Sequence, residues 1–376
     1  MGGSVNVPLL DLKAQYRSIK AEVLSVMERV CDEQGFVLGP RVVDFEKATA
    51  QYIGSQYAIG CASGSDALLL SLMAFGVKGG DEVITVPFTF FATAGAISRL
   101  GAKPVFVDIQ PETFNIDPNQ IERAITPRTK AIIPVHLFGQ CADMEAINEI
   151  AKRKHIPVIE DACQAIGAAR HGKRAGALAD TGCFSFFPTK NLGGFGDGGL
   201  ITTDDQALAD ALSMLRVHGS RVRYLHEAVG INSRLDALQA AILHVKLKYL
   251  DQWTEGRRRN AERYQQLFAQ ANLLDRVTLP LTAPENFHVY NQYTVRVAKR
   301  DELRTFLKDQ GVGSEVYYPL PMHLQNCYQE LGHRKGSFPQ SERAAEEVLS
   351  LPVYAELAAE QQGYVVQMIG EFYRRA

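Results

Sequence analysis

The sequence predicts an α/β protein: a large domain with a mainly parallel sheet between helices, then a smaller C-terminal α+β domain. The chain has 376 residues, more than one domain of ordinary size. Between residues 56 and 204, short apolar segments alternate with segments of helical spacing. Such alternation is typical of parallel strands joined by right-handed crossovers. It ends after about residue 234, which predicts a different architecture for the remainder.

The expected strands are rich in Val, Ile and Phe and are bounded by Gly, Pro or Asp. Several are apolar at consecutive positions, as a sheet covered on both faces requires. The strands are Glu82–Val86, Lys103–Asp108, Lys130–Val135, Pro157–Asp161, Cys183–Phe187 and Leu200–Thr203. The helices between them are Asp66–Phe75, Ala92–Leu100, Pro118–Ile125, Asp143–His155 and Asp205–His218.

The second part begins with a long helical stretch and then mixes short strands and helices. We expect one helix over Arg234–Phe268, weakly broken at Gly256, whose Arg257–Arg259 run forms a solvated face. Beyond it, we expect strands at Tyr293–Val297 and Glu315–Tyr318 and helices at Asp301–Gln310 and Ser341–Ser350.

Composition excludes several functional classes. The formal net charge of −2 offers no basic surface for nucleic acid or an anionic membrane. The longest mostly apolar stretch, Ala67–Val77, is too short to cross a bilayer. The six cysteines are scattered and form no C-x-x-C pair, which favours reduced thiols in a cytoplasmic protein and no metal site.

One lysine stands in a chemically suggestive place. An apolar strand ends at Pro188, and Lys190 follows in a Gly-rich turn that runs to Gly199. Desolvation beside aromatic residues lowers a lysine pKa, and only the neutral amine attacks a carbonyl to form a Schiff base. An ordinary surface lysine after a strand has the same pattern.

A second buried strand delivers Asp161 to its carboxyl end, where open α/β sheets bind ligands. A buried carboxylate needs a cationic partner, and a protonated pyridine nitrogen would serve. Pyridoxal phosphate (PLP) requires this anion to act as an electron sink. Alternatively, Asp161 caps the next helix.

Two further segments fit a phosphorylated planar cofactor. Cys61–Leu68 places Gly64 and Ser65 before a helix, where backbone N–H groups bind phosphate. Pro87–Thr93 places aromatic residues at a strand end, where one ring could stack on a cofactor. Taken singly, the first is often only a helix cap and the second only core.

The order of these elements resembles that of the fold-type-I PLP enzymes, and more narrowly the DegT/StrS sugar aminotransferases. The resemblance covers nearly the whole chain. It is carried by Val7–Leu12, Phe36–Pro40, Ala62–Leu68, Val135–Gln140, Glu160–Gln164, Ser185–Lys190 and Gly230–Ala240. We therefore expect a PLP-binding domain over residues 1–245 and a small domain over 246–376. An N-terminal arm, residues 1–12, is expected to pack on the small domain.

The resemblance implies roles around the cofactor ring. Lys190 would hold PLP as a Schiff base and later move the proton between substrate and cofactor. Asp161 would pair with the ring nitrogen, and Gln164 would contact the phenolic oxygen. Phe90 would stack on the ring, with Thr89 and Phe91 as weaker candidates.

The resemblance also implies a phosphate site and a substrate side. Gly64 and Ser65 would bind the phosphate through backbone N–H groups, and Ser185 would add its hydroxyl. Asn232 would reach the phosphate from a neighbouring subunit, which implies a homodimer with shared sites. The candidate substrate contacts are His218, Arg234, Tyr317, Tyr318 and His323. Asn232 could equally be a helix cap, Arg234 part of a salt bridge and His218 packing.

The activity implied is transfer of an amino group from L-glutamate to a nucleotide-linked keto-sugar, with C3 favoured over C4. Tyr317 stands where relatives that bind a uronate often have histidine, which argues against a carboxylated sugar, although Arg234 could still bind one. Two alternatives remain: a non-catalytic sugar-nucleotide sensor, which would not need Lys190, and another PLP reaction such as dehydration.

Overall fold

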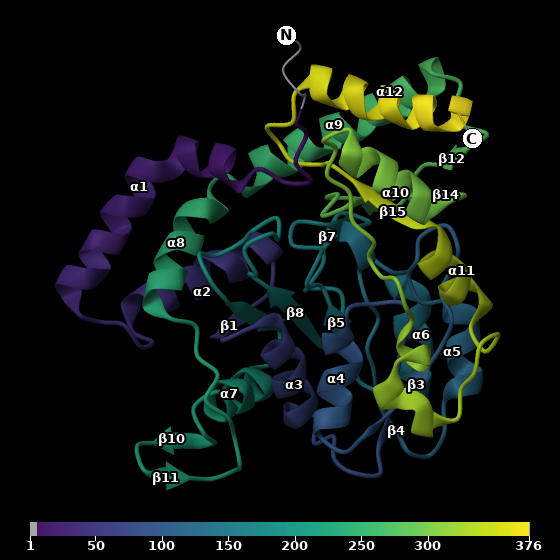
Figure 1. Ribbon diagram of the computed structural model, residues 1–376. Coiled ribbons are helices and arrows are strands. Elements are labelled where there is room, and N and C mark those ends of the chain that lie inside the picture. Colours follow the sequence, from purple (N-terminus) through teal and green to yellow (C-terminus); the bar gives the residue numbers. More distant parts are fainter. Residues whose placement is uncertain (1–5, 376) are drawn as a thin grey trace.

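The computed structural model describes residues 6–375, and its centre is a mixed sheet between two layers of helices (Figure 1). A four-stranded and a three-stranded sheet are joined by bridges from Ile132 to Val158 and from Val135 to Asp161. The resulting strand order is β1-β9-β8-β5-β4-β2-β3. Only β9 runs antiparallel to its neighbours, so the prediction of a mainly parallel sheet is confirmed.

The observed elements lie within a few residues of the expected ones. The strands are β1 Tyr57–Cys61, β2 Glu82–Thr85, β3 Lys103–Phe106, β4 Thr129–Ile132, β5 Ile159–Asp161, β8 Thr181–Ser185 and β9 Gly199–Thr203. The helices are α1 Leu12–Glu33, α2 Pro40–Ile53, α3 Gly64–Ala74, α4 Phe91–Arg99, α5 Pro118–Ala124, α6 Met144–Lys154 and α7 Gln206–Leu215. The β6–β7 pair, Ala169–Arg170 and Lys173–Arg174, lies at one edge with β13 Asn286–Phe287.

Successive strand residues face different helix layers. Cys183 and Ile201 pack in the core under α3, α4 and α7, whereas Phe184 and Leu200 pack on the opposite face with α2 and with α8, which spans Ala237–Leu247. This two-sided burial explains the continuous apolar character of these strands. Carboxylates start several of the helices: the side chain of Asp143, for example, accepts a hydrogen bond from the backbone N–H of Ala146.

The C-terminal part packs helices on a small antiparallel sheet. Its strands are β12 Val277–Thr278, β14 Tyr293–Val297 and β15 Val348–Leu351, in the order β12-β14-β15. Its helices are α9 Leu250–Gln270, α10 Arg300–Asp309, α11 Pro339–Glu347 and α12 Ala359–Arg375. Val7 pairs with Val312 beside α10, so the N-terminal segment contacts this part; residues 1–5 of the expected arm lie outside the described residues.

The expected single helix over 234–268 is wrong. It is two helices, α8 Ala237–Leu247 and α9, separated at Lys248 and Tyr249. Gly256 lies inside α9 and is buried, and a Cβ there would lie 2.8 Å from Ala355 Cα. This glycine therefore permits a close helix–loop contact and does not break the helix.

Two other expectations need correction. Arg257 is not on a solvated face: it is 5% exposed and donates to the carbonyl oxygens of Tyr290 and Val353 at 3.0 and 2.9 Å. The expected strand at 315–318 is absent, since only Glu315 pairs with the sheet. The next residues turn away, and Tyr317 and Tyr318 both line the cavity described below.

The expected late helix at 341–350 is partly wrong. Helix α11 ends at Glu347, and Val348–Leu351 forms β15, which pairs with β14 through Ser350 and Thr294. Among residues 6–375 we find no helix that is both long and apolar enough to span a membrane.

His288 should make folding sensitive to acid. Its ring is buried and its Nδ1 accepts a hydrogen bond from the N–H of Tyr290 at 3.0 Å. Burial, assisted by the charge of Arg258, lowers the pKa of His288 from 6.5 to about 3. The unfolded state therefore binds more protons between these pH values, and this contribution to stability is complete above pH 6.5 and lost as pH falls towards 3.

We expect His288→Asn to flatten the acid limb of the stability curve by up to about 1.4 kcal/mol per pH unit. Urea unfolding at pH 4.5 to 7.5 measures it, with the exposed His155 replaced by Asn as the control. Equal slopes for His288→Asn and the parent protein would contradict the prediction.

Candidate active site

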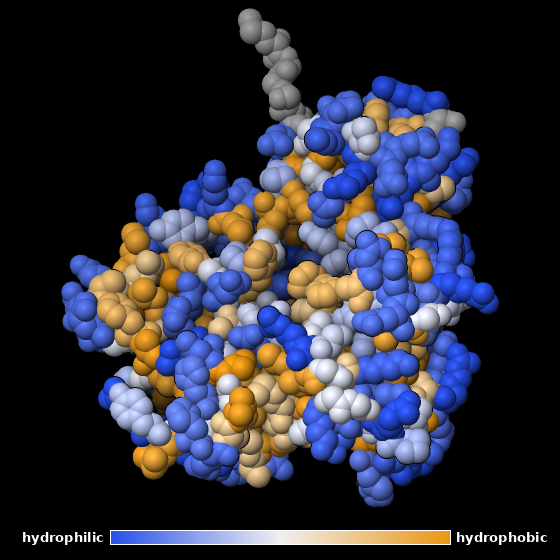
Figure 2. Space-filling view, turned by 60° about the horizontal axis from the view of Figure 1, so that its bottom comes forward, coloured by the Kyte–Doolittle hydropathy of each residue, from blue (hydrophilic) through white to orange (hydrophobic). Residues whose placement is uncertain are grey.

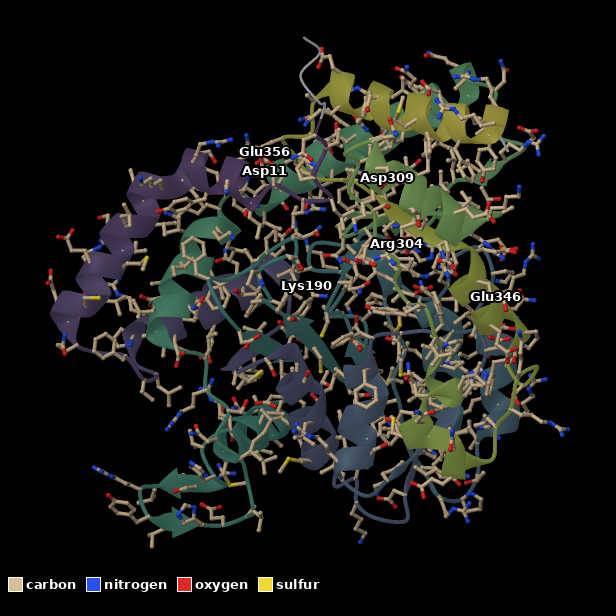
Figure 3. All side chains as sticks on the ribbon, viewed as in Figure 1. Asp11, Lys190, Arg304, Asp309, Glu346 and Glu356 are labelled. Atoms are coloured by element: carbon tan, nitrogen blue, oxygen red, sulfur yellow. The ribbon has the colours of Figure 1, made fainter. Side chains whose placement is uncertain are left out.

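A cavity of about 480 Å³ opens at the carboxyl ends of β5 and β8 and at the starts of α3 and α4. Figure 3 places Lys190 near the middle of the molecule, and the surface in Figure 2 is hollowed near its centre, with hydrophilic residues inside a partly hydrophobic rim. The structure brings most of the predicted site residues together here. They are Gly64, Ser65, Phe90, Asp161, Gln164, Ser185, Lys190, Tyr317 and Tyr318.

Asp161 is a buried acidic residue at the last position of β5. Its Oδ2 accepts a hydrogen bond from Thr93 Oγ1 at 2.7 Å, and its Oδ1 accepts one from the N–H of Cys163 at 3.2 Å. Within residues 6–375 it forms no salt bridge. A buried carboxylate that faces a cavity and has no salt-bridge partner fits a protonated ring nitrogen as its partner.

Lys190 has the properties that a carbonyl-binding lysine needs. Its backbone N–H donates to the carbonyl of Phe187 at 2.9 Å, which places it in a tight turn after β8. Burial lowers the pKa of Lys190 below its usual range, while nearby Cys163 and Asp161 act in the opposite direction. The neutral, nucleophilic amine is therefore more abundant than on a surface lysine.

Aromatic residues form one wall of the cavity. Phe90 is 57% exposed although it lines the cavity, so a ring face remains free for a planar ligand. Its ring centroid lies 6.1 Å from that of Tyr318. Gln164 donates through Nε2 to the Tyr318 hydroxyl at 3.0 Å and accepts through Oε1 from the N–H of Phe138 at 2.8 Å. This side chain therefore links the strand end to the tyrosine wall.

The start of α3 forms a narrow cradle against β8. Ser63 caps the helix by accepting from the N–H of Asp66 at 3.1 Å. A Cβ on Gly64 would lie 2.7 Å from Ser185 Cβ and 2.8 Å from Cys163 Sγ. Free N–H groups at a helix start, with the Ser185 hydroxyl beside them, suit a phosphate group.

We expect Gly64→Ala to weaken cofactor binding by about tenfold or more, because the added methyl group must displace Ser185 from the phosphate cradle. Titration of apoprotein with PLP, followed by its near-visible absorbance, measures the affinity. Gly363→Ala, at a position in α12 with open space around it, is the matched control. Unchanged affinity in Gly64→Ala would refute the cradle.

A second group of predicted residues lies elsewhere. Asn232 is exposed, and it pairs with Val217 at the base of the hairpin β10 Ser220–Val222 and β11 Leu225–His226. His218 is at the same base, where its carbonyl accepts from His226 Nδ1 at 3.0 Å. Neither these residues nor Arg234 line the cavity of the same chain. In Figure 1 the hairpin projects away from the body of the protein.

His323 is also outside the cavity. It is fully buried, its Nε2 hydrogen-bonds to Glu342 at 2.9 Å, and its ring packs against Phe338. His323 therefore does not reach the cavity of its own chain, and its predicted substrate contact has no support from this geometry. The side chain instead fixes the segment after Tyr318 to α11.

Three residues at the site were not among the predicted ones. Asp197 and Gln292 line the cavity, and Thr93 contacts Asp161 without lining it. Thr93 lies four residues after Thr89, whose hydroxyl is 3.0 Å from its own. Asp197 is the one acidic residue of the Gly-rich turn, a signal that could have identified it. Gln292 reaches the cavity because it immediately precedes β14, and no local sequence pattern predicts this position.

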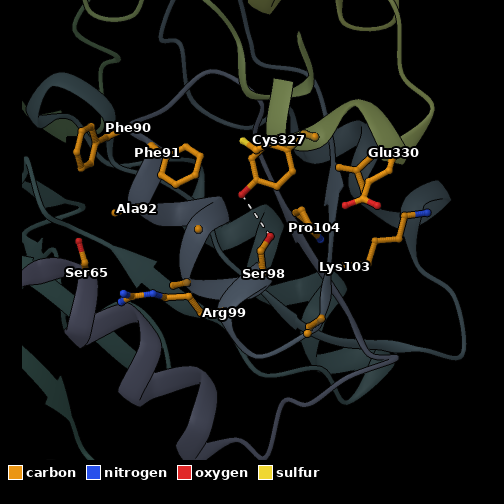
Figure 4. A pocket seen from close by; sticks show the side chains of 16 residues that line it. Ser65, Phe90, Phe91, Ala92, Ser98, Arg99, Lys103, Pro104, Cys327 and Glu330 are labelled. Carbon is orange, nitrogen blue, oxygen red and sulfur yellow. Dashed lines mark hydrogen bonds between the residues drawn. The ribbon is translucent and has the colours of Figure 1, made fainter. Parts of the chain in front are cut away.

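A larger groove of about 780 Å³ adjoins the cavity and shares Ser65, Phe90 and Ala92 with it. Figure 4 shows this groove, with Phe90 and Phe91 at one end, Cys327 between, and Lys103 and Glu330 at the other end. Ser98 donates to the Tyr328 hydroxyl, or accepts from it, across 3.3 Å. The cavity is therefore open towards a surface that could accommodate a substrate much larger than a keto acid.

The fold and this site define a PLP-dependent aminotransferase. The sequence profile of the DegT/DnrJ/EryC1/StrS aminotransferase family matches residues 17–370. The chain belongs to this family.

Three curated relatives match over nearly the full length. A protein of Geobacillus stearothermophilus named pleiotropic regulatory protein is 55% identical over 98% of this chain and 99% of its own. UDP-2-acetamido-2-deoxy-3-oxo-D-glucuronate aminotransferase of Pseudomonas aeruginosa is 46% identical over 93% and 96%. dTDP-3-amino-3,4,6-trideoxy-alpha-D-glucose transaminase of Streptomyces venezuelae is 44% identical over 98% and 97%.

Solved structures agree. DesV of S. venezuelae in complex with a ketimine intermediate superposes with a TM-score of 0.95 at 43% identity, covering 99% of each chain. Bacillus subtilis NtdA with bound cofactor PMP has a TM-score of 0.90 at 35% identity, covering 99% of this chain and 86% of its own. The prediction of the fold, the enzyme class and PLP as cofactor is confirmed.

Proposed function

We propose that the protein transfers the amino group of L-glutamate to C3 of a nucleotide-linked keto-sugar. The observation that carries this proposal is that Lys190 and Asp161 line one cavity. Phe90 lines both this cavity and the adjoining groove, where its ring could stack on a planar cofactor. The Pseudomonas relative is named for a 3-oxo sugar and the Streptomyces relative for a 3-amino sugar, which supports C3 over C4.

The residues present fit the cofactor. Gly64, Ser65 and Ser185 would hold its phosphate, and Asp161 would hold its ring nitrogen. Bound PLP supplies an electron sink for the negative charge that develops at the reacting carbon. The Asp161 carboxylate maintains a positive ring nitrogen while that charge develops.

Lys190 acts twice in this proposal. Its Nζ would hold the cofactor, and as a free amine it would accept a proton from the substrate and return it. Its lowered pKa suits both steps. Tyr318 and Gln164 close the wall behind it, which restricts water at the reacting atoms.

The cavity favours a sugar without a carboxylate. Apart from Lys190, none of the described side chains that line it is cationic, while Asp161 and Asp197 are anionic. Tyr317 is uncharged at neutral pH, and burial raises its pKa further. Within this cavity a uronate would have no counter-charge other than Lys190, so we infer a neutral keto-sugar.

The active unit in this proposal is a homodimer in the cytoplasm. Asn232 lies outside its own chain's cavity, and the nearby hairpin exposes Val222, Tyr224 and Leu225 by 60–77%. A projecting apolar hairpin favours a protein partner, and a second copy would bring Asn232 to a phosphate cradle. The cysteines are free thiols, which supports a reducing compartment.

The regulatory name of the 55% relative favours a second candidate, a sugar-nucleotide sensor on the same fold. A sensor needs the cavity but not a lysine of lowered pKa beside an unpaired buried carboxylate. This chain retains both, so we place catalysis first.

The test is a two-step assay of the purified protein. Excess L-glutamate should shift the near-visible absorbance of the bound cofactor to shorter wavelength and release 2-oxoglutarate. UDP- and dTDP-linked 3-keto and 4-keto sugars, neutral and carboxylated, should then restore it, fastest with a neutral 3-keto sugar. If glutamate causes no shift, L-glutamate is not the amino donor. Binding of a sugar nucleotide without any turnover would support the alternative of a non-catalytic sensor.

A further inference from the structure

Helix α8 packs against the turn that carries Lys190 and forms hydrogen bonds to its backbone. The turn follows β8 and folds back on itself: the N–H of Gly194 donates to the carbonyl of Phe186 at 2.7 Å. It is closely packed, because a Cβ on Gly193 would lie 2.2 Å from the carbonyl oxygen of Pro188. Its position therefore determines where Lys190 points.

Two side chains of α8 contact this turn. Gln239 Oε1 accepts a hydrogen bond from the N–H of Phe195 at 2.8 Å, and Lys246 Nζ donates to the carbonyl of Gly193. The two residues are seven apart, two helical turns, so they project from the same face of α8. Lys246 binds a carbonyl three residues after Lys190, and Gln239 binds an N–H five residues after it.

Lys246 is an unusual choice for a structural contact. It is 3% exposed, and no carboxylate pairs with it among residues 6–375. Its ammonium instead lies 5.6 Å from the ring centroid of Phe195 and 5.9 Å from that of Trp253. Burial lowers the pKa of Lys246 to about 8. Burying a cation is costly, so a residue that served only to fill space would be apolar.

We propose that Lys246, together with Gln239, is a positioning residue that clamps the Lys190 turn in the geometry that binds the cofactor. The ammonium fixes the Gly193 carbonyl by a charge-assisted hydrogen bond, and Gln239 fixes the N–H of Phe195 in the next peptide group. The same helix is linked to the phosphate cradle, because Ser233 Oγ, just before α8, accepts from the N–H of Ala62 at 3.1 Å. Helix α8 thus positions the lysine and phosphate ends of the site together. This inference rests on the proposed role of Lys190.

The experiment compares Lys246→Met with the parent apoprotein by amide hydrogen exchange. Met keeps the apolar stem and removes the ammonium. We expect exchange in residues 190–196 to quicken about tenfold or more, and the Kd for PLP to rise about tenfold. Lys246→Arg, which keeps a cationic donor, should recover most of both effects. Lys248→Met removes an exposed lysine from the same helix end and should change neither.

Gln239→Ala provides a second, less buried route if Lys246→Met fails to fold, and should quicken exchange in the same turn. Unchanged exchange in the turn, or faster exchange over the whole protein, in both variants would overturn the clamp. These outcomes are separable from failure of the proposed function. If the proposed function is wrong, Lys190→Ala would keep the near-visible absorbance of the cofactor, independently of the result for the Lys246 variants.

Discussion

Lys190→Ala should abolish both turnover and the near-visible absorbance of bound cofactor. The variant removes the one amine that lines the cavity beside Asp161, and with it both the covalent link to PLP and the proton carrier. Loss of a general base alone reduces rate by about 10²–10⁴-fold, and loss of the covalent link adds to this. Absorbance spectra with added PLP and a 2-oxoglutarate release assay measure the two losses.

Lys190→Arg tests whether charge alone is sufficient. It keeps a cation in the cavity but cannot form the covalent link, so it should be as inactive as Lys190→Ala. The melting temperature of each variant should stay near that of the parent apoprotein, because Lys190 forms no salt bridge within residues 6–375. Normal activity in either variant would refute the assignment of the active site.

Asp161→Asn should have the second-largest effect. Asn keeps the size and an acceptor for Thr93 Oγ1 but removes the charge opposite the ring nitrogen. We expect kcat to fall about 10²–10³-fold, while part of the cofactor affinity remains in the phosphate cradle. Asp161→Ala should lose at least as much rate.

Thr93→Val is the matched control for Asp161. It removes one hydrogen bond to the carboxylate and leaves the charge, so we expect a loss of about tenfold. Single-turnover kinetics with L-glutamate measure both variants. If Asp161→Asn were no slower than Thr93→Val, the carboxylate would position the cofactor without acting as its counter-charge.

Much of the fold follows from local pattern. Strands such as Glu82–Thr85 are short, apolar and β-branched, and their boundaries depend on neighbouring Gly, Pro and Asp. Helices that begin at an Asp cap, such as α6 and α7, were also predictable within three residues. By contrast, the division between α8 and α9 depends on packing, since no Gly or Pro marks residues 248 and 249.

The sequence predicted only those parts of the site that lie at the ends of strands. Asp161 ends β5, and Lys190 follows β8. These two strands are parallel neighbours in the sheet, so the two side chains lie at the same edge. The partners of Asp161 come from α4 and from its own turn, and Thr93 is found only when α4 is packed. His323 showed the reverse: its sequence context suggested a substrate contact, but it is buried against Glu342.

The sequence by itself determined the class of fold and the aminotransferase family, and it predicted Lys190 and Asp161 as the cofactor lysine and its carboxylate, because these depend on local patterns and their order along the chain. The tertiary structure alone decided which side chains surround them. Gln239 and Lys246 contact the Lys190 turn from about fifty residues away, and burial without a counter-ion gives Lys246 its lowered pKa. Long-range packing sets such contacts, and no spacing in the sequence reports them.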